Sequence, residues 1–192
     1  MGLPLKDAEL HTYSEYFDWP DDVRYELING EAYAMAPAPS PRHQEWVGEI
    51  FRQVADALEG KPCRVYLAPF DVRLPLGAEA DDDINTVVQP DLSVICDPSK
   101  IDERGCRGAP DWVIEVLSPS TAGHDMIVKR DLYELHGVRE YWIVHPTDRV
   151  VTVYTLSDGA YGKPDVYELE GEVASKALPE VVIDWVRMRL EP

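Results

Sequence analysis

The chain has 192 residues, is 45% hydrophobic, and carries a formal net charge of -18 at pH 7. This acidic surplus excludes broad attraction to a phosphate backbone, but it favours the recruitment of divalent cations. No apolar run reaches the length of a membrane span. The three scattered cysteines, Cys63, Cys96 and Cys106, form no CxxC pattern. They predict neither a disulfide framework nor a zinc site, so we expect a reducing, cytoplasmic location.

The first part of the chain predicts a short helix followed by a β-hairpin. Residues 7–17 favour the helix. Asn29-Gly30 lies between two alternating runs, Arg24–Ile28 and Glu31–Met35, and is a strong signal for a two-residue turn.

A long amphipathic helix is predicted at Arg42–Leu58. Ser40 can cap its N-terminus, and Gly60 ends it. Strands are then expected at Arg64–Leu67, Phe70–Leu74 and Thr86–Cys96, the last with a bulge or edge position at Pro90, followed by a loop at Asp97–Ala109.

After its first residue, the strand predicted at Asp111–Leu117 carries one carboxylate, Glu115, among five apolar residues. Alternation sends Trp112, Ile114 and Val116 to one face and Val113, Glu115 and Leu117 to the other. Both faces are largely apolar, which suits a central strand covered on two sides. An ionised group in such a place is costly unless it is paired or bound to a metal, so Glu115 needs a partner.

The helix predicted at Ala122–His136 supplies a candidate for that partner. Its expected core stripe is Val128, Leu132 and Leu135, and a second line of Asp125, Lys129 and Tyr133 runs beside it. Lys129 therefore lies at the boundary of the buried face. From there it can reach back to the preceding strand and Glu115.

The remaining chain predicts an antiparallel pair and shorter strands. The expected strands are Glu140–Val144, Val150–Leu156, Lys163–Leu169 and Val181–Trp185. This order lacks steady β-α-β alternation, and it predicts an α+β fold with a mixed sheet flanked by two helices. We treat 1–192 as one domain, with its core at about 24–156 and the strands at 163–185 as an appendage.

Asp91, Glu115 and Lys129 each lie beside a strongly apolar run on a different element. Two carboxylates and a lysine that converge can perform metal-assisted phosphodiester hydrolysis, because carboxylates hold Mg²⁺ and a cation offsets developing charge. Without a metal, Glu115 and Lys129 could simply pair. Secondary candidates are Glu26 in the hairpin, His43 in the first turn of the long helix, and Asp125, an i, i+4 neighbour of Lys129.

The chain resembles the Uma2 family of restriction-endonuclease-like proteins, within the PD-(D/E)XK nuclease superfamily. The stretches that carry the resemblance are YELINGE, APSPRHQ, QPDLSVICD, PDWVIEVLSPST, the D-x-x-x-K of residues 125–129, and GVREYWIVHP. The resemblance implies a restriction-endonuclease-like fold, a DNA substrate, and Mg²⁺ or Mn²⁺ held by Asp91 and Glu115. The lysine expected two residues after the glutamate is replaced by Leu117, so Lys129 would have to take its role.

Two alternatives to a metal-dependent endonuclease remain open. One is a catalytically inactive nuclease fold that acts as a binding or regulatory protein, which the negative charge and the missing Glu-x-Lys favour. The other is an α+β protein whose carboxylates serve only ion pairs. For the nuclease, a homodimer is compatible with cutting both strands, and the sequence does not decide between DNA and RNA.

Overall fold

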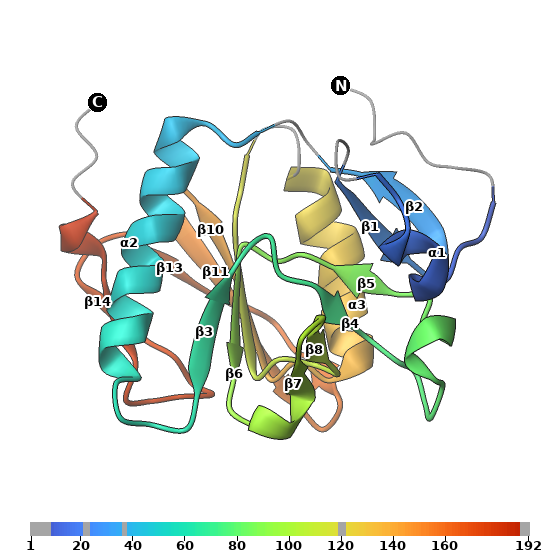
Figure 1. Cartoon of the computed structure of the whole chain (residues 1–192). Helices are drawn as coiled ribbons and strands as arrows, with labels where there is room; N and C mark the ends of the chain where they lie inside the picture. Colours follow the sequence, from blue (N-terminus) through green and yellow to red (C-terminus); the bar gives the residue numbers. More distant parts are fainter. Residues whose placement is uncertain (1–8, 21–23, 36–37, 119–121, 189–192) are drawn as a thin grey trace.

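The computed structural model describes residues 9–20, 24–35, 38–118 and 122–188. A mixed sheet forms its middle layer, with helix α2 (Pro41–Ala57) on one side and helix α3 (Arg130–His136) on the other (Figure 1). This confirms the mixed α+β prediction. Within the described ranges, no helix has both the length and the apolarity needed to cross a membrane.

Besides α2 and α3, the described residues form several short helical segments and a series of strands. The other helical segments are α1 (Tyr13–Phe17), η1 (Asp81–Asp83), η2 (Pro98–Lys100), the π-helix η3 (His124–Lys129) and η4 (Trp185–Arg187). The strands are β1 (Tyr25–Ile28), β2 (Glu31–Ala34), β3 (Arg64–Leu67), β4 (Val72–Arg73), β5 (Val87–Val88), β6 (Leu92–Ile95), β7 (Ile101–Asp102), β8 (Gly105–Arg107), β9 (Trp112–Val116), β10 (Glu140–His145), β11 (Val150–Ser157), β12 (Ala160–Tyr161), β13 (Asp165–Glu168), β14 (Glu172–Ala174) and β15 (Val182–Asp184).

The larger sheet has the order β12-β11-β10-β9-β6-β3, and β13 also pairs with β11. Strands β9 and β10 run parallel, and β9 pairs with β6 in the antiparallel sense. The strand that bears Glu115 is therefore central, as its two apolar faces predict. The hairpin β1–β2 and the antiparallel pair β10–β11 are also confirmed.

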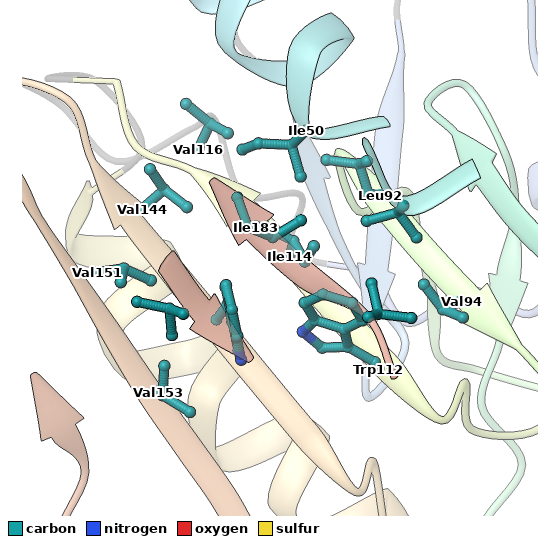
Figure 2. Close-up of a cluster of buried hydrophobic side chains, with 14 of the residues drawn as sticks. Ile50, Leu92, Val94, Trp112, Ile114, Val116, Val144, Val151, Val153 and Ile183 are labelled. Carbon is teal, nitrogen blue, oxygen red and sulfur yellow. The ribbon is translucent and has the colours of Figure 1, made fainter. Parts of the chain in front are cut away.

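The two faces of β9 enter two different cores. Trp112, Ile114 and Val116 pack with α2, β6 and β10 on one side, where Figure 2 shows the labelled side chains of this cluster. Val113 packs on the other side with residues of α3. Glu115 shares this second face. Alternation along the strand thus aims the one carboxylate of β9 toward the helix that carries Lys129.

The single strand predicted at 86–96 is wrong. It divides at Pro90 into β5, which pairs with β1 and β4 in the smaller sheet, and β6, which belongs to the larger one. Proline has no N–H to give to a sheet ladder, so the chain changes sheets at this point. The loop predicted at 97–109 is also wrong in part, because it contains β7 and β8, which form a hairpin.

The second predicted helix is helical, but its buried face differs from the prediction. Leu135 is 63% exposed, whereas Asp125 and Lys129 are each only 4% exposed. The reason is η3, where i→i+5 hydrogen bonding widens the helix and rotates the following residues relative to an α-helix. At the N-terminus, the described part of the predicted 7–17 helix is helical only at Tyr13–Phe17, and residues 7–8 lie outside the described ranges.

The cysteine prediction is also wrong, because Cys63 and Cys96 form a disulfide. They flank the antiparallel partners Arg64 and Ile95 of β3 and β6, so the strand register places them opposite each other. Cysteine spacing along the chain does not reveal this pairing, since it depends on which strands become neighbours. Cys106 is free and buried.

The C-terminal strands are attached through a buried acid. Glu140 is 0% exposed and accepts hydrogen bonds from the Trp142 indole, the Ser175 hydroxyl, and the backbone N–H groups of Lys176 and Ala177. Ile183 and Trp185 lie in the same core as α2. The division into a core and an appendage stays a prediction.

Candidate functional site

Glu115 of β9 and Lys129 of η3 meet in the interior. The Lys129 Nζ lies 2.9 Å from Glu115 Oε1, and the Tyr133 hydroxyl donates to the same oxygen at 3.2 Å. Glu115 and Lys129 are each 4% exposed. Side chains so deeply buried are rarely charged unless they are paired. The pairing expected from sequence between the strand and the helix therefore exists.

Two of the secondary candidates join the same lysine. Glu26 Oε1 from β1 lies 2.9 Å from Lys129 Nζ, and Asp125 Oδ1 lies 3.7 Å from it. The Gln89 backbone N–H donates to Glu26 Oε1 at 2.9 Å. One ammonium group thus faces three carboxylates, drawn from β1, β9 and η3.

Asp91 is tied to Glu115 and its neighbour Val116 by two hydrogen bonds. The Asp91 backbone N–H donates to Glu115 Oε2 at 3.1 Å, and the Val116 backbone N–H donates to Asp91 Oδ2 at 2.8 Å. These bonds fix the start of β6 against the end of β9. Asp91, Glu115 and Lys129, separated by up to 38 positions in the sequence, therefore form one continuous cluster.

His43 closes the Asp91 end of the cluster. Ser40 caps α2 by accepting from the His43 backbone N–H, which fixes the first turn. From this turn His43 Nε2 reaches the Val116 carbonyl at 2.8 Å and Asp91 Oδ2 at 3.2 Å. Burial opposes its protonation, but the Asp91 carboxylate and this carbonyl raise the pKa of His43.

The charges in the cluster perturb one another strongly. Burial alone would lower the pKa of Lys129, but Glu115, Glu26 and Asp125 raise it well above its usual value, so this amine keeps its proton. Burial and the neighbouring carboxylates raise the pKa of Glu115. Burial also opposes ionisation of Glu26, yet Lys129, His124 and the Gln89 N–H together lower its pKa to about 2.

The π-helix decides which side chains enter the site. Its wide turn places His124 and Lys129, five residues apart, on one face, and both contact Glu26. The Tyr141 hydroxyl donates to the Asp125 backbone carbonyl at 3.0 Å, inside this turn. Such wide turns are frequent at functional sites.

Three contributors were missed by sequence reasoning: Gln89, His124 and Tyr133. Tyr133 lies on the polar line with Lys129 and could have been found from that spacing. Gln89 is next to the Pro90-Asp91 pair, and its side chain accepts from Arg24 and donates to Tyr16 and Asp71. No local pattern signals that set of contacts.

The donor set suits a hard divalent cation. Asp91, Glu115 and the Val116 carbonyl offer oxygen atoms, the ligands that Mg²⁺ prefers. The His43 Nε2–H group lies against two of these oxygens, the Val116 carbonyl and Asp91 Oδ2. A group that carries positive charge when protonated therefore already occupies this end of the cluster. Among the described residues, no three His, Cys, Asp or Glu side chains are arranged to hold a metal as they stand. Both Glu115 oxygens already accept protein donors, so its carboxylate would have to exchange partners to bind an ion.

Comparisons with known proteins bear on the family and the fold of this chain. Residues 13–186 match the model of the Uma2 family, described as "Putative restriction endonuclease". An uncharacterised protein of Synechocystis sp. is 28% identical over 149 residues, covering 75% of this chain and 73% of the relative. A crystal structure from Anabaena variabilis, titled as a putative nuclease belonging to DUF820, superposes with a TM-score of 0.71 at 21% identity, covering 92% of this chain and 96% of that one. At that identity the likeness establishes the fold.

Proposed function

The chain belongs to the Uma2 family of restriction-endonuclease-like proteins, and from this premise we propose that it is a metal-dependent endonuclease that hydrolyses DNA phosphodiester bonds. The observation that supports this proposal most directly is the convergence of Asp91, Glu115 and Lys129 on one buried cluster. Asp91 and Glu115 would bind Mg²⁺ or Mn²⁺, and Lys129 would assist. A homodimer is part of the same proposal, whereas the disulfide of Cys63 and Cys96 removes the cysteine argument for a cytoplasmic location.

Different residues of the chain have different roles in the proposed reaction. A divalent ion held by Asp91 and Glu115 would supply neutralisation of the phosphate charge and activation of water. Lys129 keeps its proton because it faces Glu115, Glu26 and Asp125, so it acts as a fixed cation beside the phosphoryl oxygens and not as a base. The backbone N–H groups of Asp91 and Val116 hold the two carboxylates in place.

The proposal is tested by calorimetric titration of the full-length protein with Mn²⁺ and Mg²⁺, together with cleavage of plasmid DNA. We expect saturable binding and nicking by the wild type, and loss of both in Asp91→Ala. The matched control is Asp56→Ala, which removes an exposed acid of α2 that pairs with Arg52, and it should behave as the wild type does. The absence of saturable heat in the wild type would refute the metal-dependent enzyme.

The second candidate is a catalytically inactive nuclease fold that binds or regulates a partner. One observation favours it: Lys129, Tyr133 and the Asp91 N–H already satisfy both oxygens of Glu115. The net charge of -18 is unfavourable for holding DNA without a cation. DNA binding that needs no metal and produces no cleavage would support this candidate.

A further inference from the structure

One buried titratable side chain of the cluster has no role in the reaction as described so far. His124 begins the π-helix and is 9% exposed. Its Nε2 lies 3.6 Å from Glu26 Oε2, and the Tyr33 ring packs on it at 5.1 Å between centroids. Among the described parts of the chain, both ring nitrogens are buried without a hydrogen-bond partner, so Nε2 has only its ion-pair contact with Glu26 and Nδ1 has no polar partner. A buried polar atom left unpaired is costly, which suggests that it serves a ligand.

The reaction lacks a proton donor for the departing oxygen, and the other groups of the cluster are unsuited to that role. The surrounding carboxylates raise the pKa of Lys129 against the effect of burial, and burial together with the same carboxylates raises the pKa of Tyr133, so each holds its proton tightly. His43 uses Nε2 for Asp91 and the Val116 carbonyl, at the end of the cluster assigned to the metal. Imidazole is the side chain best suited to release a proton near neutral pH.

The contacts also form a chain with two distinct ends. Asp91 touches Glu115, Glu115 touches Lys129, Lys129 touches Glu26, and Glu26 faces His124. Phosphoryl transfer needs the attacking and leaving oxygens roughly in line, on opposite sides of phosphorus. Along this chain of contacts the carboxylates for the metal and the imidazole stand at opposite ends, with the ammonium group of Lys129 between them.

We propose that His124, oriented by Glu26 through Nε2, is the general acid of the proposed nuclease and donates the Nδ1 proton to the leaving oxygen. The oxygen of water forms a bond to phosphorus, and the bond between phosphorus and the leaving oxygen breaks with its electron pair on that oxygen. The oxygen takes the Nδ1 proton and departs as an alcohol. The proton lost by water goes to solvent, and His124 regains a proton from solvent. This inference rests on the function proposed above.

The experiment compares two substrates that differ in their need for a proton. DNA releases an alkoxide-like oxygen, whereas bis(p-nitrophenyl) phosphate releases a stabilised phenolate that needs none. We expect His124→Gln to lose about 100-fold or more in kcat on DNA, which is the lower range for a general acid, and less than about 5-fold on the aryl diester. The matched control is His136→Gln, on the same helix, where Nε2 is likewise buried without a partner but the ring lies near Pro75 and Glu79 instead of the cluster.

Equal losses on the two substrates would overturn the proposal, because a merely structural role would impair both. Full activity of His124→Gln on DNA would overturn it too, while leaving the nuclease itself intact. If the wild type cleaves neither substrate and binds no Mn²⁺, the proposed function fails and takes this inference with it. If His124→Gln does not fold, the smaller replacement His124→Asn is measured instead. The same ratio of activity losses on DNA and on the aryl diester is expected for it.

A second measurement needs no turnover. The imidazole Hε1 resonance of His124, assigned by its loss in His124→Gln, should shift on titration with a phosphorothioate oligonucleotide, and that of His136 should not. A His124 signal that does not move when fluorescence anisotropy reports full binding would contradict contact with substrate.

Discussion

Replacing Lys129 by methionine tests whether the cluster is the strongly coupled buried network that its geometry indicates. Lys129 Nζ lies 2.9 Å from one oxygen of Glu26 and from one of Glu115. At an effective dielectric constant of about 20, each contact is worth about 6 kcal/mol of Coulomb attraction. Desolvation of the three groups offsets most of that gain. Removing one partner of a buried pair costs about 3–5 kcal/mol, and we expect Lys129→Met to destabilise the protein by that amount at pH 7.

The variant should also respond to pH in a definite direction. The pKa of Glu115 is already raised by burial, and loss of Lys129 removes its principal opposing charge. Between the unfolded pKa and this raised value the folded state binds the proton more tightly, so stability falls as pH rises. The deficit of Lys129→Met should therefore shrink between pH 7 and pH 5. Adding Glu115→Gln to Lys129→Met should recover part of the deficit at pH 7.

The assay is urea unfolding followed by tryptophan fluorescence, repeated at pH 5 and pH 7. The control is Lys61→Met, which makes the same substitution at a partly exposed lysine 3.7 Å from Glu180. Pairs of that kind are worth about 0–1 kcal/mol. If Lys129→Met and Lys61→Met were equally stable, or if Lys129→Met did not change with pH relative to the wild type, the description of a buried, coupled network would be wrong.

Three further predictions concern other parts of the network and fold. Glu26 has a folded pKa of about 2 against a usual 4.5, so the unfolded chain binds its proton first and stability falls as pH drops through this window. As pH falls through this window, the wild type should lose about 3 kcal/mol of its free energy of unfolding, and Glu26→Gln should not. Acid unfolding of the two proteins measures this difference. Reducing the disulfide of Cys63 and Cys96, 33 residues apart, should lower stability by about 3 kcal/mol, and thiol titration of the unfolded chain should find one free thiol before reduction and three afterwards. Glu140→Ala should cost about 3 kcal/mol or more, because it leaves two buried and two partly buried donors without their acceptor, and amide exchange at 175–177 should accelerate.

Local patterns predicted the elements whose signals lie within a few neighbouring residues. The Asn29-Gly30 turn joins β1 and β2, Ser40 caps α2, and alternation in Asp111–Leu117 gives a central strand with Glu115 on the face toward α3. The position of Glu115 in an apolar strand also indicated that this acid must have a partner, because burial of an unpaired charge is costly. Local patterns therefore indicated Glu115 and Lys129 before any contact was known, whereas Asp91 rested mainly on the resemblance to the Uma2 family.

Tertiary structure decided what those patterns leave open. Pro90 divides two strands between two sheets, and the register of β3 on β6 brings Cys63 to Cys96. The wide turn of η3 buries Lys129 and exposes Leu135, against the α-helical periodicity. Only the folded chain places Glu26 and His124 beside the same lysine. Hydrophobic periodicity reports which face of an element is buried, whereas the partners of a buried charge are set by which elements become neighbours, and that depends on contacts between residues far apart in the chain.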